Sequence, residues 1–491
     1  MIVDEPRSAA TAERFSDLRE FLALVDADAE LRRFDGADWN LEIGAINEEM
    51  SQRRGPMCLF DEITGYPKGW RVTSNPFTSY RRTARVLRLP VDLAGVDLLN
   101  AWREKIRNVV PLDPVEVEDG PVFEHVMEGG AVDLFRFPAP QWNELDGGRF
   151  IGTGTATITR DPDEGWVNVG TYRNQVMGPN LLGILAVQGK HGRLHIDRWH
   201  ARGESAPVCV SVGHDPTVFV EASYNVPAGT PPFAWAGWLR GEPMEVVRSP
   251  IHGLPISATA EIVVEGVVRT PDQQPKLVEG PFGEWPGYYA YSSLGETPIM
   301  EVQAIYHRTD PIIFGAPHVK APAPTIFAFP LHAGSIWDDL ERAGIPGVTG
   351  VWRLGAWGGG AGGMFTVVAL RTAYAGHAKQ AATVAMATRA GAYGGRYVVV
   401  VDDDIDITNA DDVIWAMCTR SQAHEIDVVR GIWTSPTDPA IPPGERETGM
   451  YTSSRAIIDA TRPYAWRDQF PPINQFSREK AREIRAKWGL D

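Results

Sequence analysis

Two glutamates flank a rigid turn in the middle of the chain. Residues 279–289 read Glu-Gly-Pro-Phe-Gly-Glu-Trp-Pro-Gly-Tyr-Tyr, so Glu279 and Glu284 stand on either side of Gly-Pro-Phe-Gly. Because proline fixes one backbone angle and glycine permits angles that other residues avoid, this bend should aim both carboxylates at one place. Aromatic neighbours raise the pKa of a buried carboxyl group, which can then hold a proton near neutral pH, as a general acid must. The alternative is an exposed turn with solvated carboxylates.

A carboxylate pair in a dry site needs a cation beside it, because two like charges there cannot both ionise comfortably. Arg173, at the end of Asn168-Val-Gly-Thr-Tyr-Arg173, is the candidate. This Asn-to-Arg spacing, followed far downstream by Glu-Gly-Pro-Phe-Gly-Glu and Gly-Tyr, resembles the UbiD family of decarboxylases, which use prenylated FMN. The resemblance runs from about Leu41 to the last helix.

The resemblance implies a role for each of these charged residues. Arg173 and Glu279 match the ion pair beside the flavin, and Glu284 matches the acid that returns a proton. The residues expected to bind the cofactor are Thr153, Asn168, Gly170, Thr171, Tyr172, Arg173, Lys190, His191, Ser223 and Lys379.

Asn168 and His191 also match two of the family's ligands for a divalent metal, usually manganese, which ties the flavin phosphate to the protein. The third family ligand is a Glu, expected five residues before Gly237, and Pro232 occupies that position here. Proline cannot bind metal. Either Glu221 or a water takes its place, or the phosphate is held with little help from metal. A potassium ion is a further candidate.

Two lysines are expected at the cofactor phosphate. Lys190 stands where relatives often have Gln, and it could neutralise the phosphate or meet a substrate carboxylate. Lys379, in the first turns of a predicted helix, matches a family lysine that reaches the phosphate, and helix N-termini also favour phosphate. The alternative for each is a solvated surface lysine.

The expected chemistry needs a cofactor. Breaking a carbon–carboxylate bond on an unsaturated or aromatic carbon leaves a carbanion for which no side chain is an adequate sink. In the resembled family the prenylated flavin bonds covalently to the substrate before carbon dioxide leaves. The expected function is therefore reversible decarboxylation of an aromatic, heteroaromatic or α,β-unsaturated carboxylic acid. Two alternatives are a non-catalytic subunit of a larger carboxylase assembly, motivated by the missing metal Glu, and an ordinary flavin reductase.

The substrate pocket and the partners follow from the same resemblance. Trp285 lines the substrate site in relatives and, with Trp235 and Phe327, suggests a flat, apolar pocket. A flavin prenyltransferase is expected to supply the cofactor. By analogy alone, the C-terminal unit should assemble the chain into a homodimer or homohexamer.

Composition excludes several other classes. The chain has 491 residues and a net charge of −16, which repels phosphate backbones and makes nucleic acid an unexpected partner. No apolar run approaches the roughly 20 residues of a membrane span, and no signal peptide is visible, so a soluble cytoplasmic protein is expected. Cys58, Cys209 and Cys418 are odd in number and far apart, which supports neither disulfides nor a zinc site. All three are expected to be buried.

Hydrophobic periodicity predicts an α/β and β protein of three units. The three units are an N-terminal α/β domain (1–120), a β-rich central domain (121–316) and a C-terminal α/β domain (335–491) that ends in a helix. A linker (317–334) joins the second unit to the third. In the resembled family the central domain is a split barrel that binds the flavin. Helices are predicted over 13–25, 41–53, 335–343, 376–390, 411–419 and 478–488, and strands over 57–60, 70–74, 153–159, 208–212, 218–222, 262–268, 300–306, 365–370 and 397–401.

Two further motifs are discounted. Residues 358–363 look like a phosphate-binding loop, but a predicted strand follows them and the Gly-Lys-Ser/Thr ending is missing. Residues 402–406 look like a metal cluster, but they stand just before a predicted helix, where acids cap helix N-termini.

Overall fold

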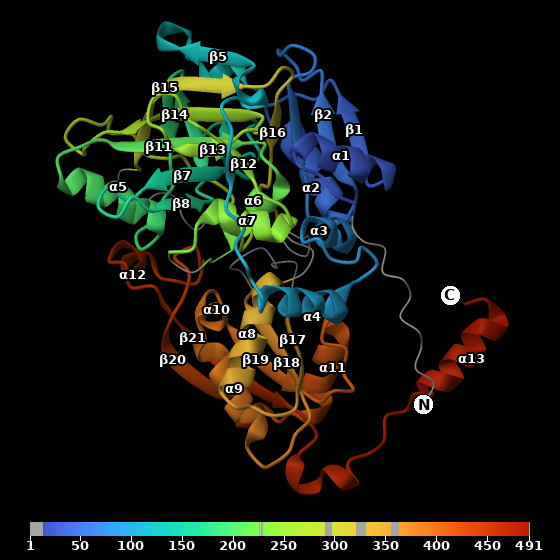
Figure 1. The fold of residues 1–491 in the computed structure, drawn as a ribbon. Helices are drawn as coiled ribbons and strands as arrows, with labels where there is room; N and C mark the ends of the chain where they lie inside the picture. The colour runs from blue at the N-terminus through green and yellow to red at the C-terminus, as the bar shows by residue number, and fades with distance from the viewer. Residues whose placement is uncertain are drawn as a thin grey trace.

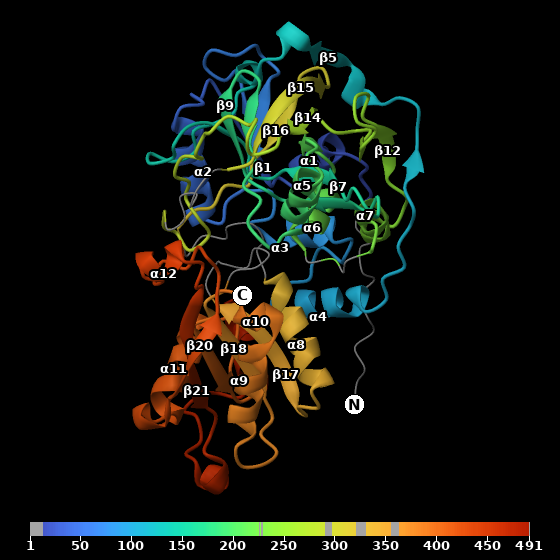
Figure 2. The same ribbon diagram turned by 90° about the vertical axis from the view of Figure 1, so that its left-hand side faces the viewer.

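The computed structural model describes residues 13–224, 226, 229–289, 297–320, 330–354 and 363–490 (Figure 1). Two views at right angles draw two bodies: the N-terminal and central units form one, and the C-terminal unit forms the other (Figures 1 and 2). Helix α4 (Gly95–Ile106) lies between them and packs against α8 (Leu331–Arg342) of the C-terminal unit.

The N-terminal unit alternates helices and short strands. Its first helix begins at Leu18 rather than at 13, because Asp17 caps it by accepting the N–H of Glu20. The described elements are α1 (Leu18–Ala27), β1 (Leu31–Asp35), α2 (Glu42–Gln52), β2 (Met57–Asp61), β3 (Arg71–Ser74), α3 (Tyr80–Val86) and α4. Their sheet has the order β1-β2-β3-β16, and its last strand, β16 (Ile312–Phe314), comes from the end of the central unit and runs parallel to β3.

The central unit is built on a large, mostly antiparallel sheet. Its elements are β4 (Val115–Glu116), β5 (His125–Glu128), β6 (Phe150–Gly152), β7 (Ala156–Arg160), β8 (Val167–Gly170), β9 (Asn174–Gly178), β10 (Leu181–Gly183), α5 (His191–Ala201), β11 (Ala206–Val212), α6 (Pro216–Ser223), α7 (Pro232–Arg240), β12 (Glu245–Arg248), β13 (Pro255–Ser257), β14 (Ile262–Val268) and β15 (Ile299–His307). The strand order is β6-β9-β10-β15-β14-β11-β7-β8, with β5 on β15. No pairing among the described strands joins β6 to β8, so the architecture is mixed α/β and the split barrel remains a prediction.

The strand predicted over 218–222 is wrong, because these residues belong to helix α6. Asp215 caps the helix: its carboxylate accepts the N–H of Thr217 at 2.8 Å, and Pro216 occupies the first helical position. The run of branched and aromatic residues favours a strand only as a weak preference, and the local cap overrides it.

The C-terminal unit is a second α/β layer. It comprises α8, β17 (Val348–Leu354), β18 (Phe365–Leu370), α9 (His377–Ala387), α10 (Arg389–Ala392), β19 (Tyr397–Val401), α11 (Ala410–Arg420), β20 (Asp427–Trp433), α12 (Pro443–Glu447), β21 (Thr452–Ala460) and α13 (Arg478–Trp488). The sheet order is β17-β18-β19-β21-β20, with β18, β19 and β21 parallel. Helix α13 stands away from both bodies (Figure 1), and none of its described side chains is buried.

Several smaller predictions can be compared with the structure. Cys58 and Cys209 are buried as expected, but Cys418 is exposed because it lies on the outer face of α11. The acids after β19 form ion pairs: Arg420 binds Asp402 at 2.8 Å and Asp404 at 2.9 Å. The glycine-rich run at 358–363 lies almost wholly outside the described residues.

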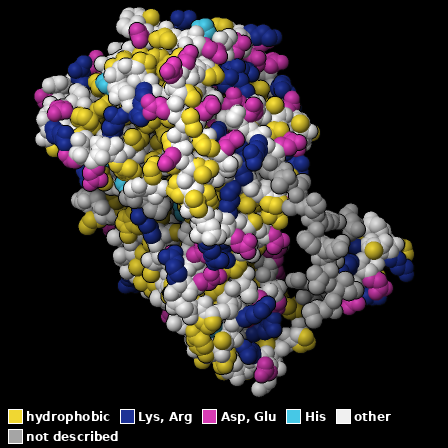
Figure 3. All heavy atoms as spheres, in the orientation of Figure 1, with side chains coloured by type: hydrophobic (Ala, Val, Ile, Leu, Met, Phe, Trp, Pro, Cys, Tyr) yellow, Lys and Arg dark blue, Asp and Glu magenta, His cyan; other side chains and the backbone are white. Residues whose placement is uncertain are grey.

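The surface mixes both signs of charge. Basic and acidic side chains are interspersed over the face drawn in Figure 3, without a large region of one sign. Among the described helices, none has both the length and the apolar character needed to cross a bilayer.

Candidate active site

Arg173 lies between Glu279 and Glu284 in a buried ion-pair triad. Its Nε donates to Glu279 Oε1 at 2.6 Å and its Nη2 to Glu279 Oε2 at 3.0 Å, while its Nη1 donates to Glu284 Oε1 at 2.7 Å. All three side chains are at least nine-tenths buried. Nη1 and Nη2 each carry a second N–H that these bonds do not use. The triad therefore keeps donor capacity for an anionic ligand.

Close backbone contacts hold the turn that carries the two glutamates. A Cβ at Gly280 would lie 2.4 Å from the Cα of Gly147, so only glycine allows the turn to seat against the loop before β6. The N–H of Gly147 donates to the carbonyl of Pro281 at 2.7 Å, and the N–H of Gly280 donates to Gln175 Oε1 at 2.8 Å. Hydrogen bonds to the loop before β6 and to β9 thus hold the bend in one conformation, as the Gly-Pro-Phe-Gly sequence predicts.

Aromatic rings exclude water from one side of the triad. The Phe282 ring lies 4.6 Å from the Arg173 Cζ, and Phe150 packs against Phe282 with ring centroids 4.5 Å apart. Trp285 is buried and contacts Gly394 of the C-terminal unit, where an added Cβ would lie 2.8 Å from the indole. Trp285 therefore marks the place where the C-terminal unit meets the glutamate turn.

Burial and charge act differently on the members of the triad. Burial raises the pKa of Glu284 above its ordinary value, and the charge of Glu279 adds to the rise while Arg173 opposes it. For Arg173, burial lowers the pKa, but the bonds and charges of Glu284 and Glu279 outweigh it and raise the pKa above its usual range. The arginine is therefore permanently charged, whereas Glu284 can hold a proton more readily than an exposed glutamate.

A second cluster forms around the hydroxyl of Tyr172. Asn168 Nδ2 donates to Tyr172 Oη at 3.3 Å, and the N–H of Gly192 donates to it at 3.0 Å. These bonds join β8 to the first turn of α5, where His191 is the first residue. A Cβ at Gly170 would lie 2.7 Å from the Tyr172 hydroxyl, so glycine is required there. The structure thus brings Asn168, Tyr172 and the start of α5 together.

Glu221 lies beside this cluster as a buried carboxylate. The N–H of Thr171 donates to the carbonyl of Ala222 at 3.2 Å, which seats α6 against the end of β8. Burial raises the pKa of Glu221 well above its ordinary value, and none of the described residues makes a hydrogen bond to its carboxylate. Burial also raises the pKa of Tyr172, and the charge of Glu221 adds to that rise. Pro232 is the first residue of α7 and offers no side-chain donor atom.

Cations face one another across the two bodies near His191. Burial lowers the pKa of Lys190, and the positive charge of Arg389, on α10, lowers it further. Burial and the same two cations lower the pKa of His191, which is therefore a neutral imidazole at neutral pH. Neither Lys190 nor Arg389 forms an ion pair with any described acid. Such a group of unpaired cations is suited to an anion such as a phosphate.

Three residues predicted to bind the cofactor, Thr153, Thr171 and Ser223, form hydrogen bonds between their hydroxyl groups and backbone atoms. Thr153 Oγ1 accepts the N–H of Ala316 at 3.0 Å. Thr171 Oγ1 donates to a backbone carbonyl at 2.9 Å, and Ser223 Oγ donates to a carbonyl one turn earlier in α6 at 2.8 Å. Each hydroxyl oxygen that donates can still accept a bond from a ligand.

The structure does not bring every predicted site residue to the triad. Lys379 forms an ion pair with Asp427 of β20 at 2.8 Å, on an exposed face of the C-terminal unit. Trp235 stacks in the hydrophobic core against Tyr224, with ring centroids 5.8 Å apart, and so does not extend the pocket at Trp285. Phe327 lies outside the described residues.

Sequence reasoning missed three residues near the site. Asp146 accepts the N–H of Gly283 at 3.3 Å, which supports the glutamate turn. Arg389 and His318 were not singled out, since neither belongs to a motif. His318 lies in the stretch predicted as a linker, so no pattern in the sequence marked it as a site residue.

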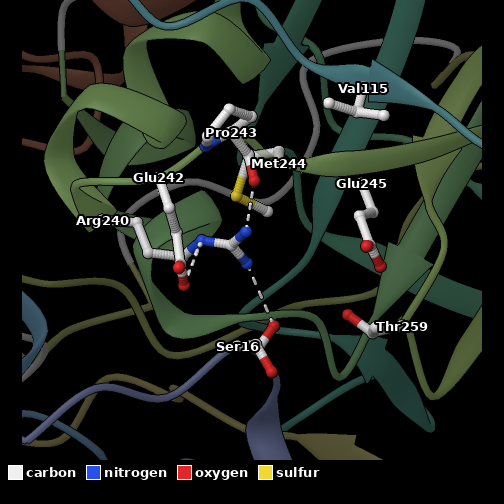
Figure 4. Close-up of a pocket in the computed structure, with 8 residues that line it drawn as sticks. All are labelled: Ser16, Val115, Arg240, Glu242, Pro243, Met244, Glu245 and Thr259. Atoms are coloured by element: carbon white, nitrogen blue, oxygen red, sulfur yellow. Dashed lines mark hydrogen bonds and ion pairs between the residues drawn. The ribbon is translucent and has the colours of Figure 1, made fainter.

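A separate pocket lies between the N-terminal and central units (Figure 4). It has a volume of about 360 Å³ and contains none of the predicted site residues. Its cation, Arg240, is already paired: it contacts Glu242 at 3.5 Å and the carbonyl of Ser16 at 3.3 Å. The residues that line this pocket therefore suggest no reaction.

In the part of the chain that is described, no three His, Cys, Asp or Glu residues form a group that could hold a metal.

Family models match the chain in three consecutive parts. The N-terminal, Rift-related and C-terminal domains of 3-octaprenyl-4-hydroxybenzoate carboxy-lyase match residues 22–102, 114–320 and 325–460. The chain belongs to the UbiD family. It is accordingly an enzyme of the carboxy-lyase class, and its triad lies where the Rift-related domain model matches.

Two relatives of this UbiD-family enzyme are informative. Pyrrole-2-carboxylic acid decarboxylase of Pseudomonas aeruginosa is 32% identical over 432 residues, which cover 84% of each chain. The UbiD-class enzyme HmfF of Pelotomaculum thermopropionicum, solved with FMN, is 27% identical with a TM-score of 0.81, covering 94% of this chain and 98% of that one. An evolved dimeric form of HmfF, solved with prFMN, has a TM-score of 0.78 at 26% identity, covering 95% of this chain and 98% of that one.

Proposed function

We propose that this UbiD-family enzyme catalyses the reversible, prenylated-FMN-dependent decarboxylation of an aromatic, heteroaromatic or α,β-unsaturated carboxylic acid. The observation that carries the proposal is the buried triad in which Arg173 bridges Glu279 and Glu284. The relatives support it, since one is named for decarboxylating pyrrole-2-carboxylic acid and another was solved with prFMN.

Each member of the triad has a role in the proposal. When bound, the prenylated flavin supplies an electron-accepting ring to which the substrate attaches before carbon dioxide leaves. Arg173 directs its two unused N–H groups toward the carboxylate of the acid. Glu279 holds the guanidinium in place through both of its oxygens. Glu284 delivers the proton that replaces the carboxyl group, and its raised pKa suits that task.

Phosphate binding is proposed for the unpaired cations. Lys190 and Arg389 approach the same region from the two bodies. Burial and the positive charge of Arg389 lower the pKa of Lys190, and an anion between the two cations would relieve their repulsion. Lys379 remains a proposed phosphate ligand, but it would first have to leave its ion pair with Asp427.

We further propose that a divalent metal is held by Asn168, His191 and Glu221. The donor set fits: an amide oxygen left free by the bond to Tyr172, a neutral imidazole and a buried carboxylate. Glu221 would then replace the family Glu that Pro232 displaces. The metal content of purified Glu221→Gln should fall well below that of the wild type when both are loaded with manganese. Equal content would refute the role of Glu221 and favour water as the third ligand.

The remaining proposals concern architecture and assembly. The central sheet is proposed to form a split barrel. The protein is also proposed to be cytoplasmic and to receive its cofactor from a flavin prenyltransferase.

Helix α13 is proposed to dock on a second copy of the chain, because Phe476, Trp488 and Leu490 at its ends are exposed. Removal of residues 471–491 should lower the solution mass from oligomer to monomer, and an unchanged mass would contradict this.

The proposed reaction is tested with the purified chain after co-expression with a flavin prenyltransferase. Release of carbon dioxide from pyrrole-2-carboxylate or another acid of the proposed class supports it. If the chain binds the cofactor but is active only after other subunits are added, the alternative of a non-catalytic assembly subunit gains support. Plain FMN with nicotinamide oxidation would favour a flavin reductase.

A further inference from the structure

The segment after β16 runs from the loop after β6 to the turn that carries Glu284. At one end, the N–H of Ala316 donates to Thr153 Oγ1 at 3.0 Å, which fixes the segment to the loop after β6. At the other end, a Cβ at Gly287 would lie 3.2 Å from the Cα of Lys320, so the segment packs against the turn that carries Glu284. The carbonyl of Lys320 also accepts from Gln52 Nε2 at 3.2 Å. His318, at the midpoint of residues 316–320, is therefore held at the site.

His318 presents a nitrogen atom that is buried and unsatisfied. Its side chain is half-buried, but Nδ1 is inaccessible to solvent and has no hydrogen-bond partner among the described residues. Burial, together with the charge of Arg173, lowers the pKa of His318 to about 4. The imidazole is thus neutral at neutral pH and offers a lone pair. Leaving a buried nitrogen unpaired is costly, so a partner should arrive with the ligand.

The other groups of the site leave a specific need for an acceptor. Arg173 provides only donors, and three of its N–H groups are already bound to Glu279 and Glu284. Glu279 accepts from Arg173 at both oxygens, and the oxygen of Glu284 that Arg173 leaves unengaged is assigned to proton delivery. A donor carried on the ring of a bound acid would therefore find its acceptor at His318.

We propose that His318 Nδ1 accepts a hydrogen bond from a ring N–H of the substrate, and so selects a pyrrole-type heteroaromatic acid over isosteric acids that lack this donor. The inference rests on the proposed decarboxylation and names the substrate class of the same site. A pocket built to pair with a polar group rejects analogues without it, because its own polar atom then stays unpaired.

The test compares three flat five-membered acids with the prenylated-FMN-loaded enzyme. Pyrrole-2-carboxylate carries a ring donor, furan-2-carboxylate carries an acceptor, and thiophene-2-carboxylate carries neither. We expect the wild type to favour pyrrole-2-carboxylate over thiophene-2-carboxylate by about 10- to 100-fold in kcat/KM. In His318→Leu this preference should shrink to about 3-fold or less, through loss with the pyrrole acid alone.

His318→Asn is the matched variant, because its Oδ1 can occupy the position of Nδ1 as an acceptor. It should retain most of the preference for the pyrrole acid. An equal loss with all three acids in His318→Leu would show a merely structural role and overturn the inference, as would a wild-type preference for furan-2-carboxylate. If the cofactor-loaded wild type releases no carbon dioxide from any acid of the proposed class, the proposed function itself fails.

Discussion

Arg173 reaches Glu284 through one hydrogen bond of 2.7 Å, from Nη1 to Oε1, and leaves the second oxygen of that carboxylate unengaged by the guanidinium. Glu279, in contrast, is bound at both oxygens. The two glutamates are therefore not equivalent. A carboxylate held at both oxygens orients its partner, whereas one held at a single oxygen keeps a second oxygen that can carry a proton.

Replacement of Glu284 should separate cofactor binding from turnover. Glu284→Gln keeps the size and the bond acceptor toward Arg173 but removes the acid, so kcat should fall by about 10²- to 10⁴-fold. The bound flavin, measured by its absorbance, should be unchanged. Glu144→Gln removes an exposed acid upstream of the site and should retain wild-type turnover. Carbon dioxide release at the wild-type rate from Glu284→Gln would refute the assignment.

The pH dependence of turnover should reflect the same acid. Burial raises the pKa of Glu284, so its protonated form persists to a higher pH than that of an exposed glutamate. As pH rises through that pKa the proton donor is lost, and kcat should decline. The alkaline decline should be missing from the residual activity of Glu284→Gln, measured over the same pH range. An identical decline in the variant would assign it to another group.

The metal-free protein should lose stability as pH rises because of Glu221. Burial raises its pKa well above the ordinary 4.5 in the folded state, so the folded protein holds this proton more tightly than the unfolded chain. The resulting stability is fully present below about pH 4.5 and is lost as pH rises toward the folded pKa, at about 1.4 kcal/mol per pH unit. Glu221→Gln should flatten the profile of unfolding free energy in chelator. Parallel profiles for the two proteins would contradict the expectation.

The close contact beneath the glutamate turn should not tolerate a methyl group. Gly280→Ala places a Cβ 2.4 Å from the Gly147 backbone, so the turn must shift, at a cost of about 1–3 kcal/mol, with loss of turnover. Gly130→Ala is the matched control, since no atom lies within 4 Å of its added Cβ. The measurements are the denaturant concentration at the midpoint of unfolding and the kcat, each compared between the two variants and the wild type. A fully active Gly280→Ala enzyme would show that the close packing of the turn against Gly147 is not needed for catalysis.

The sequence anticipated the parts of the site that depend on local motifs. Glu279 and Glu284 were identified because proline and glycine restrict the backbone between them, and Arg173 because a carboxylate pair requires a cation. Contacts between distant segments were not visible in the same way. His318 lies in a stretch that its prolines mark as a linker, and only the contacts of Ala316 with Thr153 and of Lys320 with Gly287 show that it lies near the site.

Helix and strand predictions failed where a cap or the tertiary environment decides the outcome. The β-rich residues 218–222 became helical because Asp215 and Pro216 start a helix immediately before them. Trp235 was expected beside Trp285, but it packs in the core with Tyr224, because motif distance says nothing about which side of a helix faces a pocket.

The pairing of β16 with β3 also has a consequence for how the chain is made. The first three strands of the N-terminal sheet end at Ser74, whereas the fourth begins at Ile312. At bacterial or eukaryotic synthesis rates of roughly 5–20 residues per second, the ribosome needs about 12–50 s to supply it. During that interval the edge of β3 is unpaired, and such edges invite association with other nascent chains. Expression yield should therefore depend on chaperones that shield this edge until translation has passed residue 314.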